Sequence, residues 1–352
     1  MTRAVILAWL LERDPARLET LWAAADATRR EHVGDAVHLR GLVEISNHCI
    51  RRCAYCGINI ENRSLQRYRM REEEILACAG QAVALGYGTL VLQAGEDYGL
   101  TREFVASVVR KVKSDTPLAV TLSLGERPDE DLMAWREAGA DRYLLRFETS
   151  DPDLYERIHP SLSGRSSDRL AQLRRLREMG YEIGSGVMVG IPGQSYDSLA
   201  RDILLFGELD LDMIGVGPFI PHPETPLAGA IPLAEGEQVP ATEDMTYRVV
   251  ALARLVCPEA NIPSTTALAT LNRAKGRELG LSRGANIVMP NLTPVEYRAL
   301  YEIYPAKACI GETAAECGSC LTRRIEALGR SVGTGPGGRG LPTPEGGTSS
   351  DR

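Results

Sequence analysis

Along most of the chain, short apolar runs rich in β-prone residues alternate with longer stretches whose apolar positions recur at helical spacing. The short runs predict strands at 38–46, 89–93, 118–123, 143–148, 183–189, 213–217, 261–266 and 286–289. The longer stretches predict helices that include 72–85, 102–113, 129–138, 168–179, 196–208 and 243–256. Strands that alternate with helices pair in parallel through right-handed crossovers. Eight such units predict an α/β fold of the complete (β/α)8 TIM-barrel type.

The two ends of the chain differ from this repeat. Residues 1–37 are helical and charged in pattern, so we expect an N-terminal helical cap before a barrel that spans 38–305. A C-terminal extension with a cysteine-bearing loop and a helix is expected over 306–332, and the Gly- and Pro-rich residues 333–352 predict a disordered tail. An open doubly wound sheet is the alternative fold, but no G-x-G-x-x-G motif follows the first strand.

Composition narrows the functional classes. The chain has 352 residues and a net charge of −7, which argues against a nucleic-acid-binding surface. No stretch approaches the roughly 20 apolar residues that a membrane span needs. The apolar run at 4–11 is short and is followed by charged residues, so it predicts an amphipathic helix and not a signal peptide. We therefore expect a cytoplasmic protein whose eight cysteines stay mostly reduced and are available for metal ligation.

Three of these cysteines follow the first predicted strand. Cys49, Cys53 and Cys56 have C-x3-C-x2-C spacing. Three thiolates at this spacing can hold three irons of a [4Fe–4S] cluster and leave the fourth iron open to a small molecule, whereas electron-carrying clusters usually have four cysteine ligands. Zinc usually takes four protein ligands in a structural site, and disulfide frameworks are typical of short secreted chains. The spacing therefore favours a cluster that takes part in chemistry.

Polar residues follow the second, third and fourth predicted strands. A barrel places its chemistry at the C-terminal ends of the strands, so these residues are candidates for binding. Arg146 and Glu148 are two residues apart, which puts both on one face of a strand. Each position also has a structural explanation, as a βα turn, a satisfied loop backbone or an internal ion pair. The candidates in this part of the chain are Gln93, Gly95, Glu96, Thr121, Arg146 and Glu148.

The later strands add apolar and hydroxyl-bearing candidates. Met188 lies in a glycine-containing segment that suits a flat adenine ring, and Thr265 and Thr266 end the seventh predicted strand. Met289 ends the eighth, and Tyr301 follows it closely. This set predicts a barrel mouth suited to a small polar substrate. His222, in a Pro-rich loop, is expected at the surface or behind the site.

A second cysteine set lies near the end of the predicted globular part. Cys309, Cys317 and Cys320 have C-x7-C-x2-C spacing, which could hold a second iron–sulfur cluster of the [2Fe–2S] or [4Fe–4S] type. Zinc with a fourth ligand from elsewhere is the alternative. Cys78 and Cys257 lie in apolar helical stretches and are predicted to be core residues.

The cysteine loop, with Tyr55 directly before its last cysteine, resembles the cluster loop of radical S-adenosylmethionine (SAM) enzymes. That loop indicates only the superfamily. Over about residues 35–330 the chain resembles the HydE family, the radical SAM maturases of [FeFe]-hydrogenase. The segments that carry this resemblance are 144–151 with 158–160, 188–194, 215–226, 261–268 and 284–301, together with the late cysteines.

The resemblance implies a barrel with SAM at the top of its cavity and a [4Fe–4S] cluster on Cys49, Cys53 and Cys56. The residues that it places around SAM are Tyr55, Gly95, Glu96, Glu148, Arg169 and Met188. Those that it places along the substrate cavity are Gln93, Thr121, Arg146, Thr265, Thr266, Met289 and Tyr301. Ala94 stands where the family pattern has the first glycine of a Gly-Gly-Glu segment.

The resemblance also implies partners. The family is thought to act on a small sulfur-containing substrate, an iron–carbonyl–cyanide–cysteine complex that the maturase HydG supplies, and to pass the product to the scaffold HydF. A ferredoxin or flavodoxin would supply electrons.

Three other functions remain open from the sequence. Methylornithine synthase shares the barrel and the first cysteine loop but has no need of the late cysteines. Biotin synthase needs a second cluster whose ligands lie on barrel strands, unlike Cys309, Cys317 and Cys320. A non-catalytic iron–sulfur scaffold would be expected to have full cysteine ligation, which the first loop lacks.

Overall fold

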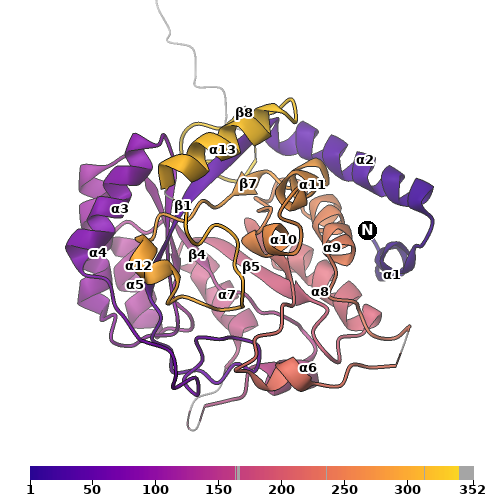
Figure 1. Ribbon diagram of the computed structural model, residues 1–352, viewed down its shortest axis with the longest axis horizontal. Helices are drawn as coiled ribbons and strands as arrows, with labels where there is room; N and C mark the ends of the chain where they lie inside the picture. The colour runs from indigo at the N-terminus through magenta and orange to yellow at the C-terminus, as the bar shows by residue number, and fades with distance from the viewer. Residues whose placement is uncertain (163, 165–166, 235, 313, 341–352) are drawn as a thin grey trace, which may run out of the picture.

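A curled parallel sheet, surrounded on its outside by helices, forms the centre of the molecule (Figure 1). The computed structural model describes residues 1–340 except 163, 165, 166, 235 and 313. The sheet runs in the order β6-β5-β4-β3-β2-β1-β7, and β8 pairs with β1 beside this path. Its strands are β1 (Ala36–Ser46), β2 (Thr89–Ala94), β3 (Ala119–Ser123), β4 (Arg142–Leu144), β5 (Glu182–Val189), β6 (Met213–Pro218), β7 (Ile287–Val288) and β8 (Ser331–Val332). The parallel α/β architecture is therefore confirmed.

Helices connect the strands and cover the outer face of the sheet, as the helical spacing predicts (Figure 1). Their apolar faces pack against the strands, and Trp135, Leu176 and Phe206 are each fully buried there. The helices before β5 are α1 (Arg3–Leu11), α2 (Pro15–Val33), α3 (Glu72–Ala84), α4 (Arg102–Asp115), α5 (Asp129–Glu137), α6 (Pro152–Ile158) and α7 (Arg169–Glu178). Those that follow are α8 (Tyr196–Glu208), the 3-10 helix η1 (Pro226–Gly229), α9 (Glu243–Val256), α10 (Thr266–Leu271), α11 (Gly276–Ser282), α12 (Val295–Arg298) and α13 (Ala314–Glu326).

The seventh predicted strand, 261–266, is not a regular strand. Asn261 forms a single parallel bridge with Met213 of β6, and Pro263 forms another with Ile287 of β7. Proline lacks the N–H that a continuous ladder needs, which limits pairing at this point. Thr265 then caps α10. The sheet is thus a seven-stranded curled half-barrel, joined across its gap by two isolated bridges.

The first two helices precede the first strand and pack on helices from later in the chain. Helix α1 packs on α8, and α2 packs on α9, so both cover the outside of the later helices. Leu21 and Trp22 of α2 are buried in this contact. Asp14 accepts a hydrogen bond from Ala16 N at the start of α2, and a proline occupies the first turn, which is the usual arrangement for a stable N-terminus.

The prediction of a disordered tail is wrong for residues 333–340. They lie against the N-terminal ends of the strands, where Gly337 O accepts hydrogen bonds from Arg40 Nη2 at 2.8 Å and from Asn261 Nδ2 at 3.2 Å. A prediction from composition is wrong here because it considers side chains alone. The backbone carbonyls of this Gly- and Pro-rich segment accept hydrogen bonds from buried side chains of the barrel. Residues 341–352 lie outside the described part of the chain.

Within the described ranges, no helix combines the length and the apolar character that crossing a lipid bilayer requires.

Candidate active site

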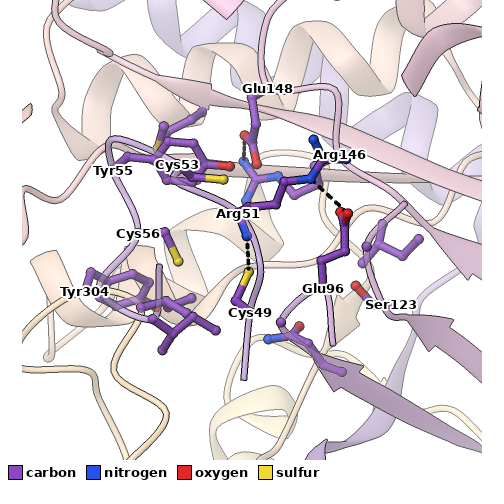
Figure 2. Close-up of a pocket in the computed structure, with 18 of the residues that line it drawn as sticks. Cys49, Arg51, Cys53, Tyr55, Cys56, Glu96, Ser123, Arg146, Glu148 and Tyr304 are labelled. Carbon is purple, nitrogen blue, oxygen red and sulfur yellow. Dashed lines mark hydrogen bonds and ion pairs between the residues drawn. The ribbon is translucent and has the colours of Figure 1, made fainter. Parts of the chain in front are cut away.

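A cavity of about 310 Å³ opens at the C-terminal ends of the strands, the end at which parallel barrels place their chemistry (Figure 2). Cys49, Cys53 and Cys56 line one side of it. Of the other predicted site residues, those that line it are Tyr55, Gln93, Gly95, Glu96, Arg146, Glu148, Arg169, Met188, Thr265, Thr266 and Tyr301. Residues from the first strand, the later strands and the segment after β7 therefore meet in one space.

The three cysteines lie on a loop that follows β1 and has little regular structure of its own. Neighbouring segments hold it: Ala54 N donates to Ile158 O at 2.8 Å, and Gly57 N donates to Ile303 O at 3.0 Å. Arg67 Nη1 donates to Ile58 O at 2.7 Å. Gly57 has no room for a side chain, because a Cβ there would lie 2.5 Å from the ring of His222. The loop is thus fixed by backbone contacts, which leaves the cysteine side chains for the cavity.

The environment of the cysteine side chains suits a multinuclear cluster. Burial raises the pKa of Cys56 to about 12, and the nearby Cys49 thiol contributes. Burial also raises the pKa of Cys53, with a contribution from Cys56. Thiols that disfavour each other's ionisation lie close together, and bound iron would remove this penalty. Among the described residues, no three His, Cys, Asp or Glu side chains are arranged to hold a single ion. Three thiolates on one loop fit a [4Fe–4S] cube, in which each thiolate binds a different iron.

A chain of four charged side chains extends from the cysteine loop along the cavity. Arg51 Nε donates to Glu96 Oε1 at 2.9 Å, and Arg51 Nη2 lies 3.0 Å from Glu126 Oε2. Glu126 Oε1 also accepts from Arg169 Nε at 3.0 Å. Burial raises the pKa of Glu96 even beside Arg51. Arg51 Nη1 is buried and has no hydrogen-bond partner among the described residues, so one guanidinium donor remains available for a ligand.

Arg169 is further oriented by His159. The Arg169 Nη2 and His159 Nε2 atoms lie 2.5 Å apart. Burial lowers the pKa of His159 to about 2, with Arg169 and Arg51 adding to the effect. The ring is therefore neutral at physiological pH, and its Nε2 can accept from the guanidinium. Arg169 Nη1 also donates to Arg146 O at 2.6 Å.

Arg146 and Glu148 form an ion pair, the structural alternative for these two positions, with Arg146 Nη2 3.0 Å from Glu148 Oε2 (Figure 2). They do not lie on a strand, because β4 ends at Leu144. Glu148 has a φ of 63°, a left-handed conformation that is unusual for a residue other than glycine. Such strain persists only where surrounding contacts impose it, and it is concentrated at functional sites. Here Glu148 N donates to Gly186 O at 3.0 Å, so pairing with β5 holds the turn.

The opposite side of the cavity carries amide and hydroxyl groups. Gln93 Nε2 donates to Tyr301 Oη at 3.3 Å. Thr265 Oγ1 is buried and has no hydrogen-bond partner among the described residues, which leaves it for a ligand. Thr121 and Met289 are not among the lining residues, although Thr121 Oγ1 is likewise buried and unpartnered within the described chain. Sequence reasoning had placed both in the cavity.

The late cysteines lie apart from this cavity. Cys309 and Cys320 line a separate pocket of about 120 Å³ together with Arg273, Arg277 and Arg324. Arg277 Nη2 donates to Cys309 Sγ at 3.4 Å. The side chain of Cys317 lies outside the described part of the structure.

Three other predictions concern residues outside the cavity. Cys78 and Cys257 are buried in the core, as expected. His222 is 4% exposed and packs on Gly57 of the cysteine loop, so it lies behind the site and not at the surface. Arg51 was missed by the sequence reasoning, although its place inside the cysteine motif is a signal that could have drawn attention to it.

Comparison with known proteins agrees with this geometry. Residues 43–206 match the Radical SAM superfamily. The chain is 46% identical to the [FeFe] hydrogenase maturase subunit HydE of Thermotoga maritima, over 96% of this chain and 94% of that protein. It is 30% identical to the 3-methylornithine synthase of Methanosarcina acetivorans, over 81% of this chain and 79% of that protein.

Solved structures show the same fold. The crystal structure of methylornithine synthase (PylB) superposes with a TM-score of 0.78 at 26% identity and covers 94% of both chains. That of HydG, a maturase of the [FeFe]-hydrogenase, has a TM-score of 0.76 at 19% identity, over 94% of this chain and 71% of that chain. With 46% identity along almost its whole length, and with the three-cysteine loop at the mouth of the barrel, this chain belongs to the HydE family of the radical SAM superfamily.

Proposed function

We propose that this protein is a maturase of [FeFe]-hydrogenase that cleaves SAM reductively and uses the resulting radical on a small sulfur-containing substrate. One observation carries the proposal most directly: the three cysteines of the radical SAM loop face the same cavity as a set of polar side chains with unused hydrogen-bonding capacity. The 46% identity to a protein named as an [FeFe] hydrogenase maturase subunit supports a role in hydrogenase maturation.

Cys49, Cys53 and Cys56 would hold a [4Fe–4S] cluster. When bound, this cluster supplies the electron that splits SAM into methionine and a 5′-deoxyadenosyl radical. The protein's own contribution is to orient SAM and to exclude water and oxygen. The apolar lining on the SAM side, including Met188, Pro218 and Ile220, favours that exclusion.

SAM would lie between the cysteine loop and the charged chain. Glu96 carries charge that could attract the methionine ammonium, although both its oxygens already accept hydrogen bonds, from Arg51 Nε and from Glu126 N. A carboxylate has about four acceptor sites, so it can also accept from a ligand. The unpartnered Nη1 of Arg51 suits the methionine carboxylate. We assign Glu148 and Arg169 to the ribose and the carboxylate side of SAM, with Tyr55 and Gly95 bordering the same space.

The substrate would occupy the deeper part of the cavity. Arg146, Gln93, Thr265, Thr266 and Tyr301 present one positive charge, one amide and three hydroxyls to it. An anionic complex that contains cyanide, carbonyl and cysteine groups fits such a lining better than an apolar molecule does. Thr121 and Met289 would act from behind this lining.

We extend the proposal to the rest of the chain. The bridges at Asn261 and Pro263 would complete a (β/α)8 barrel over 38–305, with the cap at 1–37 and the extension at 306–332. Cys309, Cys317 and Cys320 would bind a second iron–sulfur cluster, [2Fe–2S] or [4Fe–4S]. HydG would supply the substrate, HydF would receive the product, and a ferredoxin or flavodoxin would supply electrons, all in the cytoplasm.

The proposal can be tested by cluster reconstitution under anaerobic conditions, followed by dithionite and SAM, with 5′-deoxyadenosine as the product measured. We expect the product from the intact protein and none from Cys53→Ala. The matched control is Cys78→Ala, because Cys78 is buried in the core and away from the cavity. Absence of 5′-deoxyadenosine from protein with an intact cluster would refute the enzymatic proposal and favour an iron–sulfur scaffold.

A further inference from the structure

Cys49 lines two hollows at once. It borders the central cavity, and it also borders a groove of about 460 Å³ that is distinct from that cavity. We call this second hollow the arginine groove. The residues that line it are His48, Cys49, Ile50, Ile60, Asn62, Arg63, Leu65, Arg67, Arg69 and Asp97. The two sets of lining residues share Cys49, so one cluster ligand separates the groove from the cavity.

The arginine groove is positively charged, although the chain as a whole has a net charge of −7. Three arginines line it against one carboxylate, Asp97. Arg69 pairs with Asp97, with Arg69 Nε 2.7 Å from Asp97 Oδ2. Two arginine charges are therefore left without a carboxylate in the groove.

These two charges differ in their surroundings. Arg67 donates to four backbone carbonyls, those of Asn47, Ile58, Asn59 and Asn62, which orient its guanidinium without neutralising it. Arg63 is exposed, and no carboxylate of the described residues lies within ion-pair distance of it. One charge is thus fixed beside the cysteine loop, and the other is free to meet a partner.

The rim of the groove also offers apolar contact. Ile60 is 47% exposed, although most large apolar side chains of the described chain are buried, and Leu65 lies beside it in the groove. Apolar side chains bordered by arginine are typical of protein–protein interfaces, where arginine is enriched and lysine is not. A small anion would use the charges but would gain nothing from the exposed isoleucine.

We propose that the arginine groove is the docking site of an acidic one-electron carrier protein, which reduces the cluster through the Cys49 ligand. This inference rests on the proposed function, since it assumes a cluster on Cys49. The step transfers one electron: the carrier is oxidised by one electron, the cluster is reduced by one, and no bond or proton moves. Charge complementarity favours an acidic partner. The positive groove would attract such a partner, while the rest of the chain, with its net charge of −7, would repel it, so the partner would be oriented on the groove.

The test uses the cluster-loaded protein and a flavodoxin of strongly negative net charge as the probe. The variant is Arg63→Glu, an exposed charge reversal that breaks no ion pair in the described chain. The matched control is Arg110→Glu on α4, also exposed and without an ion pair among the described residues. Arg110 lies in the C-terminal half of α4, which leads toward the N-terminal end of β3, opposite the cysteine loop.

Two quantities are measured at several salt concentrations: the Kd of the complex with oxidised flavodoxin, and the rate at which reduced flavodoxin bleaches the cluster absorbance. We expect Arg63→Glu to raise the Kd by about fivefold or more at low salt and to weaken its salt dependence, because a rim charge acts on encounter and orientation. Arg110→Glu should match the unmodified protein. Ile60→Glu should act in the same direction as Arg63→Glu.

Dithionite separates this proposal from the proposed function. It is small and does not need a docking site, so cluster reduction and 5′-deoxyadenosine formation with dithionite should be the same in all variants. If Arg63→Glu and Arg110→Glu behave alike with flavodoxin, the groove is not the docking site and the inference is overturned. If dithionite yields no 5′-deoxyadenosine from the unmodified protein, the proposed function fails instead, while the effect on flavodoxin binding still decides the groove.

Discussion

Lys307 and Glu44 form a buried ion pair between the Lys307 ammonium and Glu44 Oε1. Glu44 lies on β1, five residues before Cys49, and is 1% exposed. Asn291 Nδ2 donates to its other carboxylate oxygen at 3.0 Å. The Lys307 ammonium also lies 5.4 Å from the centre of the Tyr301 ring, which borders the cavity. The pair therefore fixes the segment that carries Tyr301 against the first strand. Lys307 itself lies two residues before Cys309.

The first prediction concerns this ion pair. Lys307→Met should leave the Glu44 carboxylate buried without its charge partner, which typically costs about 3–5 kcal/mol of unfolding free energy. The double variant Glu44→Gln/Lys307→Met should recover most of that loss, because no charge then remains unpaired. Urea unfolding of the four proteins of this cycle measures the effect. Additive losses in the double variant would show that the two groups do not interact.

The second prediction concerns Asp202 of α8, which holds the turn after Glu148. Its Oδ1 accepts from Ser150 N and Ser150 Oγ, both at 2.6 Å, whereas its Oδ2 is buried and unpartnered among the described residues. Burial raises the pKa of Asp202 to about 6, above the usual value of 3.8. The folded protein thus binds this proton more tightly than the unfolded chain does. The contribution of this proton to the free energy of unfolding is fully present below about pH 4 and is lost as the pH rises through 6.

Asp202→Asn removes this titration and keeps an oxygen that can accept from Ser150. As the pH rises from 4 to 7, the unmodified protein should lose unfolding free energy that the variant keeps. The difference between the two proteins should therefore shift in favour of the variant by about 3 kcal/mol at most, as two pKa units imply. Chemical unfolding at both pH values measures the difference, in which other titrating groups cancel. A difference that stays constant with pH would show that Asp202 is already ionised at pH 4 in the folded protein.

The third prediction concerns residues 333–340. Arg40 is buried, and burial lowers its pKa to about 9, so it depends on nearby acceptors such as Gly337 O. Pro336 O likewise accepts from Thr89 Oγ1 at 2.9 Å. A chain that ends at residue 332 should lose about 2–4 kcal/mol, since several buried donors would lack acceptors. A chain that ends at 340 keeps these contacts and is the control, and equal melting temperatures for the two truncations would contradict the role of the segment.

The fourth prediction concerns the late cysteines. Cys309→Ala or Cys317→Ala should remove the iron of the second site and leave dithionite-driven 5′-deoxyadenosine formation mostly intact, because Cys309 lies outside the central cavity. Iron content and the electron paramagnetic resonance of the reduced protein check the first effect, and product formation checks the second. A complete loss of SAM cleavage would mean that the late site takes part in it.

Much of the architecture could be predicted from the sequence because it depends on local patterns. Alternating apolar runs and amphipathic stretches identify the strands and helices, and the spacing of Cys49, Cys53 and Cys56 identifies the cluster loop. Because a barrel gathers the C-terminal ends of its strands at one end, that loop is expected beside Arg146, Glu148 and the other residues that follow the strands. Segment 261–266 misled this reasoning because its β-prone composition is interrupted by Pro263, and pairing there is limited to two bridges.

The remaining features depend on contacts between distant segments. Lys307 is 263 residues from Glu44, and no spacing rule relates them. The left-handed turn at Glu148 is imposed by β5 and has no sequence pattern of its own. Residues 333–340 have the composition of a disordered tail and are ordered only because buried donors of the barrel meet their carbonyls. Thr121 and Met289 were assigned to the cavity from their places at strand ends and from the family pattern, but neither is among the residues that line it.

The central claim is that this chain acts in hydrogenase maturation, and reconstitution of an inactive [FeFe]-hydrogenase tests it most directly. The measurement is hydrogen evolution after incubation of the apo-hydrogenase with HydG, HydF and this protein under reducing conditions with SAM, beside a parallel assay for methylornithine formation from lysine. The account predicts active hydrogenase with the intact protein, none with Cys53→Ala, and no product from lysine. An inactive hydrogenase together with conversion of lysine would contradict it and identify the protein as a methylornithine synthase.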